Sequence, residues 1–189
     1  MKNKLLELAR GKNALRALFG ISFIESSVFP IPPDIMLIPM VLARPKRAWL
    51  IAGVCTLASV LGGVLGYAIG ILAWETIGQP VLEFYGKQES YAVFKNWFEE
   101  WGFWAVFGAG FTPFPYKVIT ITSGSVHLNF LAFVAASVLA RGGRFFLVAA
   151  IIRFAGERAR VWIEKYFGWI TLVLFVGALL GLFALKFIH

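Results

Sequence analysis

The stretch FIESSVFPIPPDIMLIP, residues 23–39, lies in the first long apolar region of the chain but lacks the composition of a continuous spanning helix. It carries two carboxylates, Glu25 and Asp34, and four prolines, three of which lie within residues 30–33. Proline cannot continue a helix, and the residue before a proline is pushed toward an extended conformation. We therefore expect two short helices that meet at a kinked tip. The tip prolines are Pro30, Pro32 and Pro33.

The overall composition is that of an integral membrane protein. The 189 residues are 59% hydrophobic and 15% charged, and the mean hydropathy is +0.77. Soluble domains are about 45–50% apolar and about 25% charged. The length fits a single domain. The formal charge of +8 is explained by basic cytoplasmic loops, so we expect no nucleic-acid partner.

Basic residues flank the first apolar region on both sides. Residues 1–16 contain five bases and one acid, and their leucine spacing predicts an amphipathic helix on the membrane surface. The apolar region at 17–43 is followed by three bases within 44–47. A single crossing would place these two basic clusters on opposite sides, against the positive-inside rule. We therefore predict that residues 17–43 form a re-entrant hairpin on the cytoplasmic face, followed by a spanning helix at 48–74.

The same argument applies to a second interrupted apolar region, residues 101–124. It follows a polar stretch at 75–100 that holds five acids and two bases and is predicted to be external. If residues 101–124 crossed the membrane, the basic loop at 153–167 would lie outside. A second re-entrant hairpin, with Pro113 and Pro115 at its tip, keeps that loop in the cytoplasm.

The predicted fold is an all-α polytopic membrane protein with two inverted repeats. Each repeat is a re-entrant hairpin plus a spanning helix, the second one at 129–152, and a C-terminal spanning helix is expected at 168–187. Paired broken segments in inverted repeats are typical of transporters, whose substrate site lies where the segments meet. A small-residue face for close helix packing is predicted in the first spanning helix. It consists of Gly62, Gly66 and Gly70.

Five ionisable residues remain at membrane depth: Glu25, Asp34, Lys117, Arg141 and Arg144. Each costs about 2.5–3.5 kcal/mol at a helix centre on insertion scales. One interpretation is that acids and bases only pair, for example Glu25 or Asp34 with Arg144, and lock the hairpins together. The other is that the three bases bind an anionic group such as phosphate, for which arginine offers bidentate geometry. The two acids are then counter-ions or proton carriers.

The sequence predicts neither a metal site nor a cofactor site. Cys55 is the single cysteine, and His127 and His189 stand apart from other ligand types. There is no Walker-type glycine loop and no nucleophile–base pair, so we do not expect an enzyme. Hydroxyl groups near the second tip could add ligands, although such groups more often bond to helix carbonyls. They are Thr112, Thr120, Thr122 and Ser123.

Two elements together carry a family resemblance. Glu25, followed by Pro-Ile-Pro-Pro-Asp at 30–34, and the later Thr-Pro-Phe-Pro-Tyr-Lys at 112–117 resemble the DedA superfamily, also called the VTT or SNARE-associated Golgi-protein family. The resemblance covers residues 21–160, and the second element is similar to the YqaA-like bacterial branch. Lys117 departs from the pattern, since many members have arginine there.

The resemblance implies movement of lipids between leaflets. This is phospholipid scrambling in eukaryotic relatives and recycling of undecaprenyl phosphate in some bacterial ones, with a link to the proton-motive force. It also implies a multi-pass protein of the bacterial inner membrane with a cytoplasmic N-terminus. Three hypotheses stay open: an ATP-independent lipid translocase, a proton-coupled transporter of a small soluble solute, and a non-transporting assembly protein. The sequence names neither the lipid nor the oligomeric state.

Overall fold

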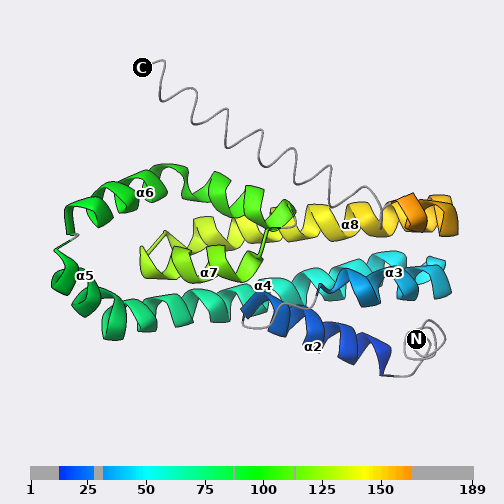
Figure 1. Ribbon diagram of the computed structural model, residues 1–189. Coiled ribbons are helices and arrows are strands. Elements are labelled where there is room, and N and C mark those ends of the chain that lie inside the picture. The colour runs from blue at the N-terminus through cyan, green and yellow to red at the C-terminus, as the bar shows by residue number, and fades with distance from the viewer. Residues whose placement is uncertain (1–12, 28–31, 87, 113, 163–189) are drawn as a thin grey trace, which may run out of the picture.

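The computed structural model describes residues 13–27, 32–86, 88–112 and 114–162. Every regular element in these ranges is helical, which confirms the all-α prediction for this part of the chain (Figure 1). The predicted C-terminal span at 168–187, most of the predicted amphipathic helix at 1–16, and the tip residues Pro30 and Pro113 lie outside the described residues. The elements are α2 (Ala14–Ser27), α3 (Asp34–Ala43), η1 (Pro45–Arg47), α4 (Ala48–Ala73), η2 (Trp74–Gly78), α5 (Gln79–Tyr85), α6 (Gln88–Phe111), α7 (Tyr116–Ser125) and α8 (Phe130–Trp162).

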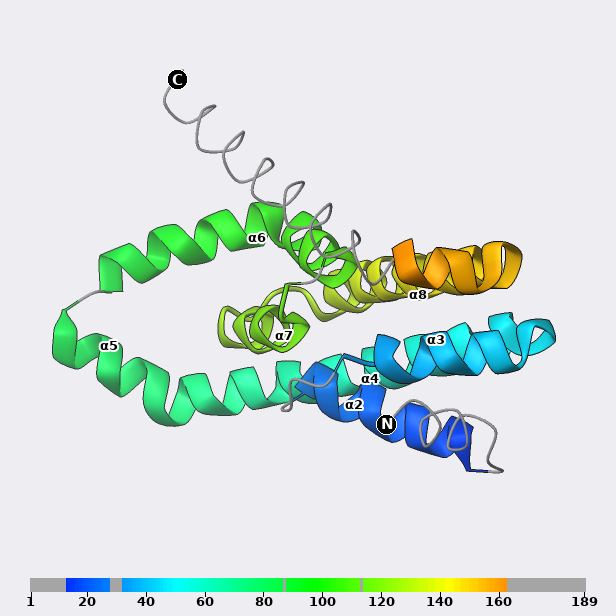
Figure 2. The ribbon, with the colours of Figure 1, turned by 45° about the vertical axis from the view of Figure 1, so that its right-hand side comes forward.

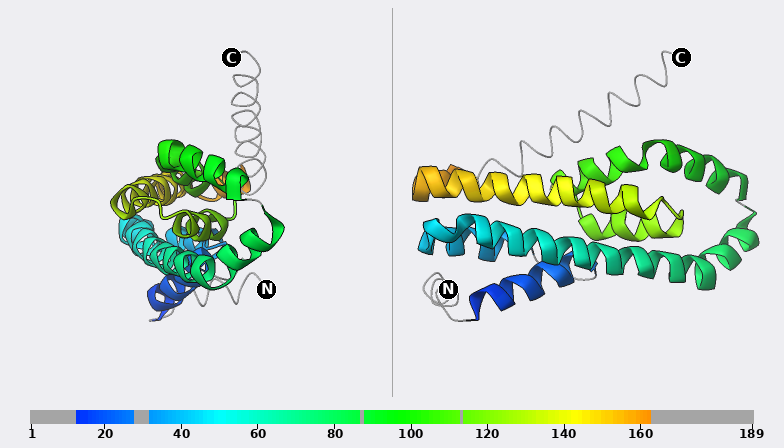
Figure 3. Two further views of the ribbon diagram at one scale, coloured as in Figure 1. Left: turned by 90° about the vertical axis from the view of Figure 1, so that its left-hand side faces the viewer. Right: turned by 180° about the vertical axis from the view of Figure 1, so that it is seen from behind.

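Two long apolar helices, α4 and α8, run antiparallel along the length of the molecule (Figures 1 and 3). Among the described residues, two helical stretches are long and apolar enough to cross a membrane, Pro45–Phe84 and Phe130–Gly156. The first stretch contains the predicted span at 48–74, and the second overlaps all but the first residue of the predicted span at 129–152. The first stretch is extended past α4 by the π-helical turn η2 and by α5.

The shorter helices form two pairs that approach the middle of the molecule from opposite ends. The beginning of α2 and the end of α3 lie at one end of the molecule, beside the start of α4 (Figure 2). The end of α6 and the beginning of α7 meet near the middle, whereas α5 and the first half of α6 project beyond the opposite end (Figure 3). The breaks of both pairs therefore face each other. The re-entrant insertion of these pairs and the inverted repeat stay predictions.

Several predicted boundaries differ from the observed ones. Helix α2 begins at Ala14, inside the segment assigned to the amphipathic helix. The polar stretch at 75–100 is almost entirely helical, and α6 continues from it into the second apolar region without a break. The described part of the predicted basic loop at 153–167 is also helical, apart from a kink at Gly156 (φ 60°). Helix α8 runs on beyond this kink to Trp162. Charge patterns locate such segments relative to a membrane but carry no information on where a helix ends.

Glycines on α4 allow both helix pairs to approach its backbone. A Cβ at Gly62 would lie 2.2 Å from the carbonyl oxygen of Phe23 in α2, and one at Gly70 would lie 2.0 Å from that of Ile121 in α7. At Gly66 the nearest atom would be the Thr120 hydroxyl, at 2.3 Å. The predicted small-residue face of α4 is thus confirmed as a packing face. It contacts both pairs along one helix.

Two apolar clusters fill the ends of the interior, and polar groups lie between them. The first joins α2, α3, the start of α4 and the end of α8, and includes Leu18, Leu37 and Phe145. The second joins α4, α6, α7 and the start of α8, and includes Phe98 and Phe133. Between them lie buried serines and arginines. This layer is formed by Ser22, Ser26, Ser59, Thr120, Arg141 and Arg144.

Replacement of Gly70 by alanine should destabilise the contact between α4 and α7. The new Cβ would fall 2.0 Å from a backbone oxygen, which cannot move aside as a flexible side chain can, so we expect a loss of about 1–3 kcal/mol. The measurement is the melting temperature of the purified protein in detergent.

Gly53 provides the matched control, because it lies on the same helix and a Cβ there would meet nothing within 4 Å. Alanine is the better helix former, so Gly53→Ala should leave the melting temperature unchanged or raise it. Equal melting temperatures for the two variants would contradict the close approach of α7 to α4.

Candidate functional site

The first break places both acids beside the polar layer. Helix α2 ends at Ser27, just after Glu25, and α3 begins at Asp34 behind Pro32 and Pro33. The carbonyl oxygens of these prolines accept hydrogen bonds from the first amides of α3, at 3.2 and 2.9 Å. Asp34 lies in the first turn, where a negative charge is favoured by the helix dipole. The proline pair thereby fixes where the Asp34 side chain leaves the backbone.

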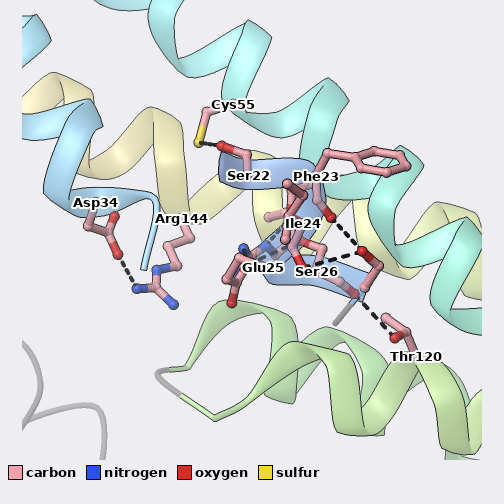
Figure 4. Close-up of polar contacts among 12 residues, drawn as sticks. Ser22, Phe23, Ile24, Glu25, Ser26, Asp34, Cys55, Thr120 and Arg144 are labelled. Carbon is pink, nitrogen blue, oxygen red and sulfur yellow. Dashed lines mark hydrogen bonds and ion pairs between the residues drawn. The ribbon is translucent and has the colours of Figure 1, made fainter. Parts of the chain in front are cut away.

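The second break lies between α6 and α7. Helix α6 ends at Phe111, and α7 begins at Tyr116 after Pro115, whose backbone is extended (φ −61°, ψ 99°). Thr120 on α7 donates to the Lys117 carbonyl at 2.9 Å and lies 3.5 Å from the carbonyl oxygen of Ser26. The end of α2 therefore contacts α7 close to the second break, as Figure 4 shows at Thr120.

Arg141 is the most buried charge in the described chain, with 1% of its surface exposed. Its Nη2 donates to Glu25 at 2.7 Å, and its Nε donates to the Ser59 hydroxyl at 2.6 Å. Ser59 and Ser26 are 2.6 Å apart, and Ser26 donates to Glu25 at 3.1 Å. Because Ser26 gives its single hydroxyl proton to the Glu25 carboxylate, it accepts from Ser59, which donates its own proton to Ser26. A closed ring of hydrogen bonds thus joins α8, α4 and α2.

Arg144 lies one turn further along α8 and connects the two breaks. Its Nη2 donates to Asp34 at 2.5 Å (Figure 4), and its Nη1 donates to the carbonyl oxygen of Thr112 at 3.0 Å. Asp34 is the first residue of α3, and Thr112 follows the last residue of α6. Arg144 is therefore bonded to both breaks at once. The second carboxylate oxygen of Asp34 is buried, and no donor among the described residues reaches it.

All five predicted charged residues come together in this region. Glu25 pairs with Arg141 and Asp34 pairs with Arg144, so ion pairing between the predicted acids and arginines is present for both acids. The sequence-based interpretation considered Arg144 as a partner for either acid and did not assign Arg141 to Glu25. Pairing alone leaves open whether the residues also bind a ligand.

A cavity of about 190 Å³ lies between the two breaks. Its charged lining consists of three bases and one acid, and the remainder is proline and phenylalanine. Asp34 does not line the cavity but contacts Arg144, which does. The lining residues are Glu25, Pro32, Pro33, Phe114, Pro115, Lys117, Arg141 and Arg144. Pro32, Pro33 and Pro115, predicted as tip residues, thus border the same cavity.

The hydroxyl groups near the second break bond mainly to helix carbonyls. Thr112 donates to Ala109 at 3.4 Å, and Ser123 donates to Ile119 at 2.7 Å. Sequence reasoning missed the polar groups on α4 and the aromatic groups around Arg141. Ser59 had a usable signal, since a serine near the middle of an apolar helix can face a buried charge. In the described ranges, histidine, cysteine, aspartate and glutamate form no group of three that could hold a metal.

Comparisons with known proteins find relatives that cover most of the chain. A protein of Haemophilus influenzae described as uncharacterized is 39% identical, in an alignment that covers 98% of this chain and 96% of the relative. A Mycobacterium bovis protein described as an uncharacterized membrane protein is 30% identical, with 82% of this chain and 74% of the relative covered. Undecaprenyl phosphate transporter A of Bacillus subtilis is 33% identical over a shorter alignment, which covers 44% of this chain and 45% of the relative.

No solved structure matches the chain. The family model of the VTT domain matches residues 31–154, which is more than half of the chain and includes the second part of the first break, the second break and both arginines. The resemblance carried by the proline-containing elements is thereby confirmed, and the chain belongs to the VTT-domain family, also called the DedA family.

Proposed function

We propose that this protein moves a phosphate-bearing lipid between the leaflets of a bacterial inner membrane, without ATP hydrolysis. The observation that carries the proposal is the cavity between the two breaks, whose lining holds three cations and one carboxylate. A phosphate group is complementary to this excess of positive charge, and arginine can bind it in a bidentate manner. The Bacillus subtilis relative, whose name includes undecaprenyl phosphate transport, supports the same substrate class.

The position of the charges along α8 fits a site near the middle of a bilayer. Arg141 lies 11 residues after Phe130 (141 − 130) in the apolar stretch Phe130–Gly156, or ~16 Å along the helix axis at 1.5 Å per residue. The hydrocarbon core is about 30 Å thick. Irregular backbone at such depth is tolerated only where it is buried or lines a wet cavity. The two breaks satisfy this condition if the helix pairs are re-entrant.

Labelling of single cysteines from each side of the membrane tests the re-entrant arrangement. Cysteine at Arg10 and at Lys46 should react from the cytoplasmic side, and cysteine at Glu83 should react from the outside. Lys46 and Glu83 are exposed, and native Cys55 is buried and should stay silent. Reaction of the Arg10 and Lys46 positions from opposite sides would show that residues 17–43 cross the membrane.

Variants of the cavity bases should separate phosphate binding from ion pairing. Lys117→Ala should lower lipid flipping in reconstituted vesicles, whereas Lys117→Arg keeps the charge and should be tolerated. Arg144→Ala leaves the Asp34 carboxylate without its partner and should cost roughly 3–5 kcal/mol of stability.

The double variant Asp34→Asn with Arg144→Ala removes both charges, so it should regain most of that stability and still not flip lipid. Flipping is measured with labelled anionic and zwitterionic lipids, and uptake of soluble solutes is measured in the same vesicles. Normal flipping by the double variant would mean that Arg144 serves the fold alone. Solute uptake without lipid flipping would favour the transporter of a soluble solute.

Asp34 is the better placed of the two acids to carry a proton. One of its carboxylate oxygens is buried and receives no donor from the described residues, whereas Glu25 is part of the closed hydrogen-bond ring with Arg141. Asp34→Asn should therefore remove the dependence of flipping on a pH gradient. Glu25→Gln should mainly lower the melting temperature. An unchanged gradient dependence in Asp34→Asn would remove Asp34 from proton transfer.

A further inference from the structure

Two aromatic rings contact the guanidinium group of Arg141. Its Cζ lies 4.8 Å from the ring centroid of Tyr116 and 4.7 Å from that of Phe145. Both rings are fully buried. Tyr116 is the first residue of α7, and Phe145 lies one turn after Arg141 on α8. The Arg141 side chain is thus held in two ways. Its nitrogen atoms donate hydrogen bonds, and its Cζ lies over two aromatic rings.

Arg144 is less enclosed than Arg141. It donates to Asp34 and to a backbone carbonyl at the second break, and 10% of its side chain is exposed, compared with 2% for Arg141. Asp34 is also more exposed, at 20%, than Glu25, at 15%. Arg141 is thus the more enclosed of the two arginines that line the cavity.

We propose that Tyr116 and Phe145 are positioning residues that hold the Arg141 guanidinium as a fixed cation in the wall of the cavity that receives the phosphate group. This inference rests on the proposed function. Cation–π contacts are strengthened when the cation is desolvated, as Arg141 is. The two ring contacts also favour one orientation of the planar guanidinium group. Lysine has no planar group to orient in this way. The fixed charge would lower the free energy of a phosphate in the cavity without itself being released.

The ring contacts can be measured without any transport assay. Protons of a guanidinium side chain above an aromatic face resonate upfield, so the Hε and Hδ signals of Arg141 should be shifted in arginine-labelled protein in nanodiscs, with Arg141→Lys providing the assignment. Tyr116→Leu and Phe145→Leu should each move these signals back toward ordinary values. Tyr116→Phe retains a ring and should retain the upfield shift.

Transport supplies the second readout. Tyr116→Leu should raise the mole fraction of labelled phosphate lipid required for half-maximal flipping by about 3- to 30-fold, the factor expected from the loss of a buried cation–π contact. Tyr116→Phe should restore the wild-type value. Phe133→Leu is the matched control, because Phe133 is equally buried on α8 but packs against Tyr67, at 5.0 Å between ring centroids. It should lower the melting temperature and leave half-saturation unchanged.

A double-variant cycle completes the test. In the Arg141→Lys background, Tyr116→Leu should cause no further rise in half-saturation, because the planar group that the ring orients is already gone. Equal rises in both backgrounds would overturn the positioning role. It would also be overturned if Tyr116→Leu moved the Arg141 signals back toward ordinary values but left the half-saturating mole fraction of lipid unchanged. A wild type that flips no phosphate lipid would overturn the proposed function and the positioning role together, while the NMR result would still establish the ring contacts.

Discussion

The two buried arginines of α8 need polar partners, and the other described helices are arranged so that they supply them. A guanidinium group cannot be deprotonated in a protein, and one left without partners in an apolar interior would cost several kcal/mol. The hydrogen bonds of Arg141 and Arg144 reach several other parts of the chain, among them Glu25 of α2, Asp34 of α3, Ser59 of α4 and the Thr112 carbonyl after α6. Helix α8 thereby determines where both breaks must lie. The ion pairs connect segments that are more than a hundred residues apart in the sequence.

Helix α4 makes this arrangement possible through the small size of its side chains. Gly62 and Gly70 allow backbone oxygens of α2 and α7 to approach the helix more closely than any Cβ would permit. At the level of the arginines, the face of α4 presents Ser59 instead of glycine, and its hydroxyl links Arg141 to Ser26. A single helix thus supplies close packing at two levels and, about one turn before Gly62, a polar partner. Leucine at Ser59 would fill the same layer with an apolar group and interrupt the hydrogen-bond ring.

The sequence identified the charged residues but not their pairing. Prolines stop helices by a local mechanism, so the breaks near Pro32 and Pro115 followed from composition alone. A charged side chain at membrane depth is unfavourable unless it has a partner. This cost likewise identified the residues that need partners, namely Glu25, Asp34, Lys117, Arg141 and Arg144. Which acid pairs with which arginine depends on the depth and rotation of each helix, and local sequence does not encode these. The aromatic contacts of Arg141 were missed for the same reason, since Tyr116 and Phe145 resemble ordinary core residues in the sequence.

Helix ends were predicted less well than helix positions. The positive-inside rule concerns the side of the membrane on which charges lie, and it is indifferent to whether those charges sit on a helix or on a loop. Helix α8 continues through Arg153, which the charge pattern had assigned to a loop. The Arg153 guanidinium lies 5.3 Å from the ring centroid of Trp49. This contact joins the end of α8 to the start of α4. It gives Arg153 a structural partner that a count of loop charges does not anticipate.

Charge balance connects phosphate binding with protons in the proposed function. The three bases and two acids of the site sum to +1 (3 − 2). A phosphodiester headgroup carries one negative charge, so its entry brings the net charge of the site to zero. No change in the protonation of the five residues is required. A phosphate monoester carries about −1.5 to −2 at neutral pH, and its entry leaves an excess of negative charge beside the two carboxylates. Under the proposed function, uptake of one proton would relieve this excess, and Asp34 has a buried oxygen to which no described donor is bonded. A need for a proton would then follow from the charge of the headgroup rather than from the lipid tail. A site with these five residues would couple monoester lipids to protons more strongly than it couples diester lipids.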